Sequence, residues 1–137
     1  MVLIAILGWY YLRNPIGPKL QINNQVFTIE LALTEPQQRQ GLSGREMLPE
    51  NHGMLFVYPG KNMYSFWMKD MKFALDFIWI DDTTVVDITK NVLPPTITGN
   101  TLTVMPNQQV NRILELNAGT VDRVGIKKGD TVTFLRK

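Results

Sequence analysis

The chain has 137 residues, which suits one domain with a single sizeable core; 45% of the residues are hydrophobic and 19% are charged. Fourteen Lys and Arg against 12 Asp and Glu give a net charge of +2 without a basic cluster, so nucleic acid is not an expected partner. Cysteine is absent, which excludes disulfides, thiol nucleophiles and Cys-ligated metal sites.

The first 13 residues, MVLIAILGWYYLR, form an apolar run that ends in aromatic residues and an arginine, as membrane helices do at the interface. About 12 residues reach about 18 Å, short of the hydrocarbon core of about 30 Å. We therefore expect residues 1–13 to be part of a membrane anchor whose first part is missing; a shortened signal sequence or an extra element packed on the domain are the alternatives. Residues 14–18, rich in Pro and Gly, are the predicted linker, and residues 19–137 the predicted domain. The expected location is membrane-anchored or exported, in the cell envelope.

The domain is predicted to be mostly β. Alternating residues over 19–33 predict two short strands, and Thr34, Pro36 and Gln37 predict a short helix that Gly41 ends. Further strands are predicted over 54–58, 63–68, 73–80, 85–90, 101–105, 110–117 and 131–135, with a short helix over 120–125. Eight or nine short strands with frequent turns indicate a compact antiparallel β-sandwich or barrel-like domain with one or two short helices. Helices long enough for parallel crossovers are not predicted.

Residues 73–80, FALDFIWI, are apolar on both faces of the predicted strand, which favours a central strand. Asp76 lies among aliphatic neighbours on one face. A buried carboxylate must be hydrogen-bonded, ion-paired or protonated. Asp76 is therefore either a functional acid or ligand anchor, or a structural acid that fastens loop amides or one arginine.

Glu115 in RILELN repeats this arrangement on another predicted strand. If the two strands were neighbours, Asp76 and Glu115 could meet in one cleft and act as the two carboxylates of a hydrolase. A surface glutamate paired with Arg45 or Arg123 is the simpler interpretation. Trp67 and Tyr64, near a Pro-Gly turn, could form an aromatic platform for a sugar or peptide, or belong to the core and its rim.

Five methionines and the single histidine fall close together in the middle of the chain, and thioether with imidazole ligands suits Cu(I). His52, Met54 and Met68 are the candidate ligands of this alternative. However, Met54 and Met68 continue apolar strand faces, and methionine often fills gaps in cores. The sequence therefore predicts no metal site and no cofactor.

Four segments, GLSGREML, HGMLFVY, FWMKDMKFALDFIWID and ILELNAGTVDRVGIKKGD, together resemble the domain-of-unknown-function 192 family of prokaryotes. The resemblance covers roughly residues 20 to 137; one departure is Ala74, where the family pattern usually has proline. It implies a compact β-sandwich, commonly behind a signal sequence or membrane anchor, and it supplies no reaction. The positions that match the family's motifs are Gly41, Leu42, Arg45, Gly53, Met54, Leu55, Phe56, Phe66, Trp67, Met68, Asp76, Glu115 and Gly119.

Together these features predict a membrane-tethered or exported β-sandwich that acts as a binding or accessory module of the envelope rather than as an enzyme. The expected site is one partly buried polar pocket formed by Arg45, Trp67, Asp76 and Glu115. The ligand of this pocket is expected to be a small molecule, glycan or peptide. The N-terminal segment of the chain is expected to contact the membrane. The hydrolase and Cu(I) interpretations are the alternatives.

Overall fold

The structure, a computed structural model, describes residues 17–135 and confirms a mostly β domain. Nine strands and three short helices are present in this range. In chain order they are β1 (Lys19–Ile22), β2 (Gln25–Ala32), α2 (Glu35–Gln40), β3 (His52–Asn62), β4 (Phe66–Trp67), β5 (Leu75–Asp81), β6 (Thr84–Val92), α3 (Pro95–Thr98), β7 (Thr103–Val104), β8 (Val110–Asn117), α4 (Thr120–Val124) and β9 (Val132–Leu135).

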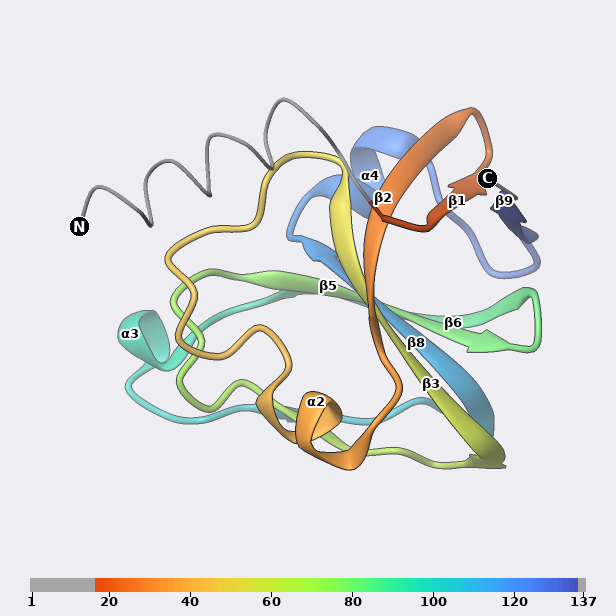
Figure 1. The fold of residues 1–137 in the computed structure, drawn as a ribbon. Coiled ribbons are helices and arrows are strands. Elements are labelled where there is room, and N and C mark those ends of the chain that lie inside the picture. The colour runs from red at the N-terminus through yellow and green to blue at the C-terminus, as the bar shows by residue number, and fades with distance from the viewer. Residues whose placement is uncertain (1–16, 136–137) are drawn as a thin grey trace.

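Seven strands form one curled sheet in the order β6-β5-β8-β3-β2-β1-β9, and β4 and β7 form a small second sheet (Figure 1). The pairs in the large sheet are antiparallel except β2–β3, which is parallel. The curl brings the two edges together, since the Val132 amide donates to the Thr83 carbonyl at 2.7 Å and the Val85 amide to the Asp130 carbonyl at 2.9 Å. The sheet is therefore barrel-like at this end.

The helix ends follow from local sequence. Thr34 caps α2 by accepting from the Gln37 amide, while the Gln37 side chain accepts from the Thr34 amide, which is the expected capping box. Gly41 and Gly125 end α2 and α4 with positive φ angles of 50° and 76°, as predicted. Between β6 and β7, Pro95–Thr98 forms the single turn of α3.

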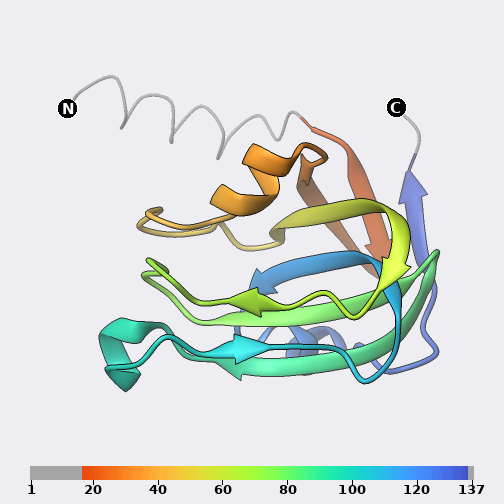
Figure 2. The ribbon, with the colours of Figure 1, turned by 90° about the horizontal axis from the view of Figure 1, so that it is seen from below.

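The large sheet buries a hydrophobic cluster on each face. The first cluster includes Phe56, Phe77 and Trp79, and it is covered by the chain around α2 and by the small β4–β7 sheet. The second includes Ile78 and Leu114 and extends to α4. Figures 1 and 2 show α2 and α4 on opposite sides of the β5–β8 region. β5 lies between β6 and β8, next to the edge strand, and it is buried on both faces, as its sequence predicts.

The close approach of β3 to β8 requires the glycine at position 53. A Cβ there would lie 2.7 Å from the backbone oxygen of Glu115 and 2.7 Å from a methyl of Leu116, closer than non-bonded atoms pack. Met54, the next residue, is paired in register with Glu115. Gly53 therefore allows the β3–β8 contact beside the position that the site below depends on.

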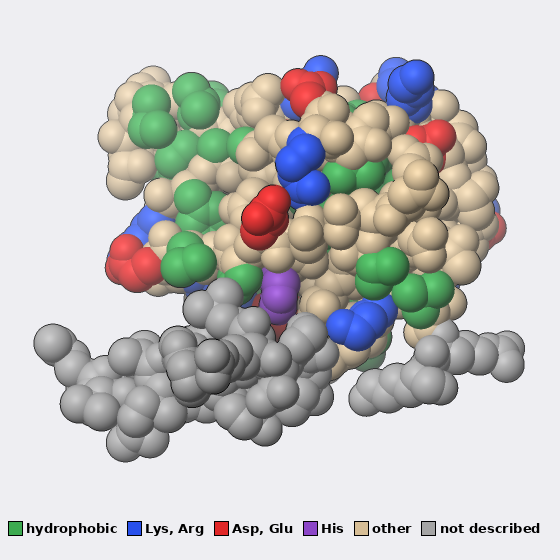
Figure 3. Space-filling model, turned by 90° about the horizontal axis from the view of Figure 1, so that it is seen from above, with side chains coloured by type: hydrophobic (Ala, Val, Ile, Leu, Met, Phe, Trp, Pro, Cys, Tyr) green, Lys and Arg blue, Asp and Glu red, His purple; other side chains and the backbone are tan. Residues whose placement is uncertain are grey.

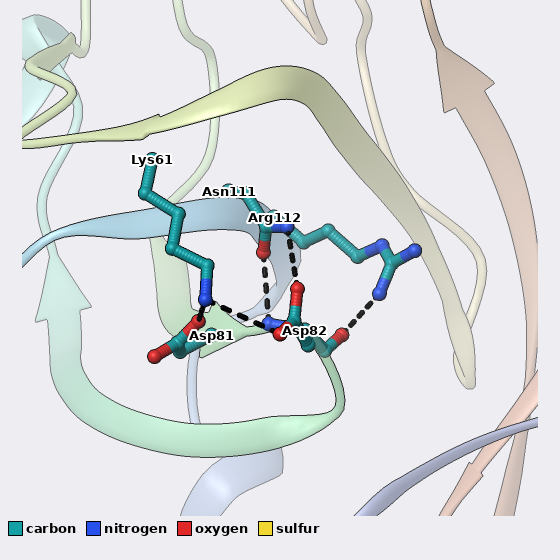
Figure 4. Close-up of polar contacts among 5 residues, drawn as sticks. All are labelled: Lys61, Asp81, Asp82, Asn111 and Arg112. Carbon is teal, nitrogen blue, oxygen red and sulfur yellow. Dashed lines mark hydrogen bonds and ion pairs between the residues drawn. The ribbon is translucent and has the colours of Figure 1, made fainter.

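A polar network fastens the β5–β6 turn to the neighbouring strands (Figure 4). Lys61 Nζ lies 2.7 Å from Asp81 Oδ1 and 3.2 Å from Asp82 Oδ2. Asn111 bonds both the amide and the carboxylate of Asp82, at 2.8 and 2.9 Å, and Arg112 donates to the Asp82 carbonyl. Because each carboxylate has a cationic or amide partner, this acidic pair is explained by structure.

The predicted membrane segment, residues 1–13, lies outside the described residues. None of the helices that the structure describes is long and apolar enough to cross a membrane.

Candidate functional site

The candidate site is centred on Glu115 of β8. Its register neighbours are Met54 on β3 and Phe77 on β5, so its side chain lies on the face of the first hydrophobic cluster. Glu115 is only 5% exposed, and its Oε2 has no hydrogen-bond partner among the described residues. A buried carboxyl oxygen without a partner is rare in folded proteins, and it marks a position where a ligand or water would gain a bond.

The surroundings of Glu115 disfavour its charged form. Burial raises the pKa of Glu115 from 4.5 to about 8, and the positive charge of Arg45 opposes this in part. Burial also raises the pKa of Tyr58 to about 12, with smaller contributions from Tyr64 and Glu115. At neutral pH both groups are therefore protonated, and the carboxylic acid of Glu115 can donate one hydrogen bond and accept others.

A pocket of about 340 Å³ includes Glu115 among its lining residues. Its volume falls at the lower end of the range for small-molecule sites. Helix α2 and the turn after it form one wall, and β3 and β4 form the other. The lining residues are Glu35, Gln38, Arg39, Gln40, Gly41, Leu42, Ser43, Phe56, Tyr58, Ser65, Phe66, Trp67, Met71 and Glu115.

Trp67 lies in this pocket wall with Glu115, so the structure brings together two of the four predicted site residues. Its side chain is 55% exposed, and the Lys69 ammonium lies 5.1 Å from the centre of its ring. Tyr64, the other residue of the predicted platform, stacks on Tyr58 at 3.8 Å instead. Trp67 is therefore part of the pocket rather than of the core.

Arg45 does not line the pocket. It forms an ion pair with Glu30 on β2; the Arg45 side chain is partly exposed and the Glu30 side chain is exposed. Its influence on Glu115 is electrostatic and acts at a distance. The prediction that Arg45 contacts the pocket carboxylates is therefore wrong, because its ion-pair partner is Glu30.

Asp76 lies on the opposite face of the sheet, away from the pocket. It is fully buried, with Oδ1 accepting from the Asn91 amide at 2.9 Å and Oδ2 from the Val121 amide in α4 at 2.9 Å. It is thus the structural acid that fastens loop amides. The predicted hydrolytic pair of Asp76 with Glu115 is wrong in its geometry, because the sheet lies between the two carboxyl groups.

The Cu(I) alternative needs His52 and methionine sulfurs that converge at the surface. Met68 is fully buried and Met54 nearly so, and both pack in the first hydrophobic cluster. His52 is half-buried at the start of β3, where burial and Lys19 lower its pKa. The surface arrangement that the copper alternative requires is therefore not found for these three residues.

Two parts of the pocket were not predicted from the sequence. Tyr58 shares a face of β3 with Phe56, so the period of two could have found it. The wall provided by α2, including Gln38, depends on how the segment after β2 folds back over the sheet. Gln38 Nε2 fixes this position by donating to the carbonyls of Ala32 and Val57, at 3.2 and 2.9 Å.

The described residues form a small, mostly β domain whose curled sheet carries a pocket with aromatic walls and a buried acid among its lining residues. The family model DUF192, described as an uncharacterised ACR, matches residues 18–134. The chain therefore belongs to the DUF192 family, as its motifs predict.

Two solved structures have this fold. One, from Sinorhizobium meliloti 1021 and described as "a putative transcription regulator", is 31% identical with a TM-score of 0.78, covering 85% of this chain and 92% of that one. The other, of unknown function, from Novosphingobium aromaticivorans DSM 12444, is 31% identical with a TM-score of 0.76, covering 83% of this chain and 82% of that one. No curated protein matches the chain.

Proposed function

We propose that this chain is a binding module of the cell envelope that holds a small ligand in the Glu115 pocket. The observation that carries the proposal is the unpartnered Oε2 of Glu115 at the base of a pocket with aromatic walls. A polar group that bonds this oxygen would remove the cost of leaving it buried without a partner, about 1–3 kcal/mol. Aromatic faces around it supply apolar contact and orientation.

The proposal is tested by screening the full chain against small molecules, soluble glycans and short peptides, with binding measured as a rise in melting temperature. Trp67→Ala should abolish or reduce the shift caused by any ligand of the pocket. Lys90→Ala is the matched control, because Lys90 pairs with Asp122 of α4, on the opposite side of the sheet. A ligand that raises the melting temperature equally in the wild type, Trp67→Ala and Lys90→Ala binds elsewhere. If the screen finds no ligand of the pocket, the proposal is overturned.

We also propose that the N-terminal segment tethers the domain to the membrane. Its support is the sequence alone: an apolar run followed by Trp9, Tyr10, Tyr11 and Arg13. The full chain should sediment with membranes after cell lysis, and a chain without residues 1–18 should not. Sedimentation of both chains, or of neither, would overturn the tether.

A role in transcription, suggested by the description of the Sinorhizobium protein, has less support in this chain. The net charge is +2, and Figure 3 shows acidic and basic side chains interspersed on one face of the molecule. Proteins that hold nucleic acid usually concentrate Lys and Arg on one surface. The pocket is therefore the better guide to function.

A further inference from the structure

The charges of the pocket favour a cation over an anion. Three acidic or basic side chains line the pocket. They are Glu115 at its base, and Glu35 and Arg39 on α2. Arg39 is neutralised by an ion pair with Glu35, and both of these side chains are exposed. An anionic ligand would find no unpaired positive charge among the lining residues, whereas a cation would find the carboxyl group of Glu115.

The walls of the pocket suit a cation as well. Phe56, Tyr58, Phe66 and Trp67 contribute aromatic rings. The faces of such rings attract ammonium groups, and the attraction increases when water is excluded. Trp67 already attracts one, since the Lys69 Nζ lies 5.1 Å from its ring centre.

We propose that the group which reaches Glu115 is the ammonium of a small organic cation, quaternary or protonated, held between the carboxylate and the aromatic walls. This inference rests on the proposed function and names the class of its ligand. The positive charge of the cation compensates the carboxylate, which burial otherwise disfavours. The aromatic rings contact its methyl or methylene groups.

Binding of a cation displaces a proton. In the free protein at neutral pH Glu115 is protonated, because burial raises its pKa to about 8. The arriving cation stabilises the carboxylate, so the O–H bond breaks and the proton leaves to solvent. Tyr58, beside Glu115, stays neutral because its pKa is raised to about 12. The charge of Arg45 lowers the pKa of Glu115. The charges of Glu35 and Arg39 neutralise each other in their ion pair. Strands β4 and β5 present aromatic side chains.

The test compares three probes of similar shape: choline, its neutral isostere 3,3-dimethylbutan-1-ol and the anion 3,3-dimethylbutanoate. Each is titrated into the ¹⁵N-labelled full chain, and the indole N–H signal of Trp67 is followed, assigned through its loss in Trp67→Phe. Methylammonium and tetramethylammonium extend the series to smaller cations. We expect an ammonium probe to bind at least tenfold more tightly than the neutral and anionic probes.

The pH dependence supplies an independent readout. With a free pKa of about 8, choline affinity should rise by about fiftyfold from pH 6 to pH 8 and level off above pH 9. Calorimetry at pH 6.5 in buffers of different ionisation enthalpy should show the release of about one proton per ligand bound. Glu115→Gln should bind choline at least tenfold more weakly, without this pH dependence, while retaining the wild-type melting temperature at pH 6.

The outcomes separate this inference from the proposed function. If the neutral or anionic probe binds as tightly as choline, the cation is overturned and the pocket remains a binding site. If none of the ammonium probes binds but a screened ligand does, the result is the same. If neither the probes nor the screened ligands bind, both proposals are overturned.

Discussion

Asp76 and Glu115 lie on adjacent strands but on opposite faces of one sheet, because Asp76 is paired in register with Leu116 and Glu115 with Phe77. Both are buried, yet they differ in their partners. Asp76 accepts two backbone hydrogen bonds, while Oε2 of Glu115 has no partner within the described residues. The first carboxylate therefore serves the fold, whereas no hydrogen bond within the described residues accounts for Oε2 of the second.

Replacing Asp76 should damage stability without altering the pocket. Asp76→Ala leaves the amides of Asn91 and Val121 without their acceptors, so we expect a loss of about 3–5 kcal/mol in the free energy of unfolding. The control is Asp122→Ala, because Asp122 lies next to Val121 in helix α4. This change removes only the exposed ion pair with Lys90 and should lower the free energy of unfolding by less than about 1 kcal/mol. Urea unfolding measures both. Equal losses in the two variants would contradict the structural role of Asp76.

Glu115 should make stability depend on pH. Its pKa is about 8 when folded and near 4.5 when unfolded, so between these values the folded state binds the extra proton. The stabilisation is complete below pH 4.5 and is lost as pH rises through 8, by about 1.4 kcal/mol per pH unit. Because other groups also titrate, the quantity to measure is the difference between the wild type and Glu115→Gln from pH 5 to pH 9. A difference that stays constant would show that Glu115 is charged throughout.

The glycine at position 53 should tolerate no side chain. Gly53→Ala places a Cβ 2.7 Å from the Glu115 carbonyl oxygen, which is backbone and moves little, so we expect a loss of about 1–3 kcal/mol. Gly60→Ala is the matched control on the same strand, since nothing lies within 4 Å of its added Cβ. Thermal unfolding of the two variants should rank them in this order; a Gly53→Ala melting temperature equal to that of Gly60→Ala would contradict the close β3–β8 packing.

The two tryptophans on either side of Asp76 should behave differently. Trp79 is fully buried and its indole N–H donates to Thr89 at 2.9 Å, so Trp79→Ala should cost about 3–5 kcal/mol. Trp67 is 55% exposed, and Trp67→Ala should cost less than about 1 kcal/mol while weakening ligand binding. Chemical unfolding and titration with choline, measured on both variants, check the pair. A stable Trp67→Ala variant with unchanged affinity would remove Trp67 from the pocket.

Local features were predictable from the sequence, because they depend on residues a few positions apart. The capping box of Thr34 and Gln37, the helix ends at Gly41 and Gly125 and the two-sided burial of β5 belong to this class. Alternation also shows which residues of β5 share a face with Asp76, and which residues of β8 share a face with Glu115. Whether the two faces coincide depends on register, which nonlocal pairing sets.

The remaining features depend on contacts between distant segments. The parallel β2–β3 pair follows from the path of the chain through α2, and the same path places Gln38 over the sheet as a pocket wall. The positive charge of Arg45 lowers the pKa of Glu115. The ion-pair partner of Arg45 is nevertheless Glu30, which is distant in sequence. Sequence patterns therefore identified Trp67 and Glu115 as candidates without showing that these two, rather than Asp76 and Glu115, share a pocket.

The most direct test of the central claim is a titration of the Glu115 side-chain carboxyl by ¹³C NMR, first alone and then with saturating choline. Our expectation is a midpoint near pH 8 in the free protein and a midpoint at least one pH unit lower in the presence of choline. A midpoint near 4.5 in the free protein, or one near 8 that choline leaves unchanged, would contradict it.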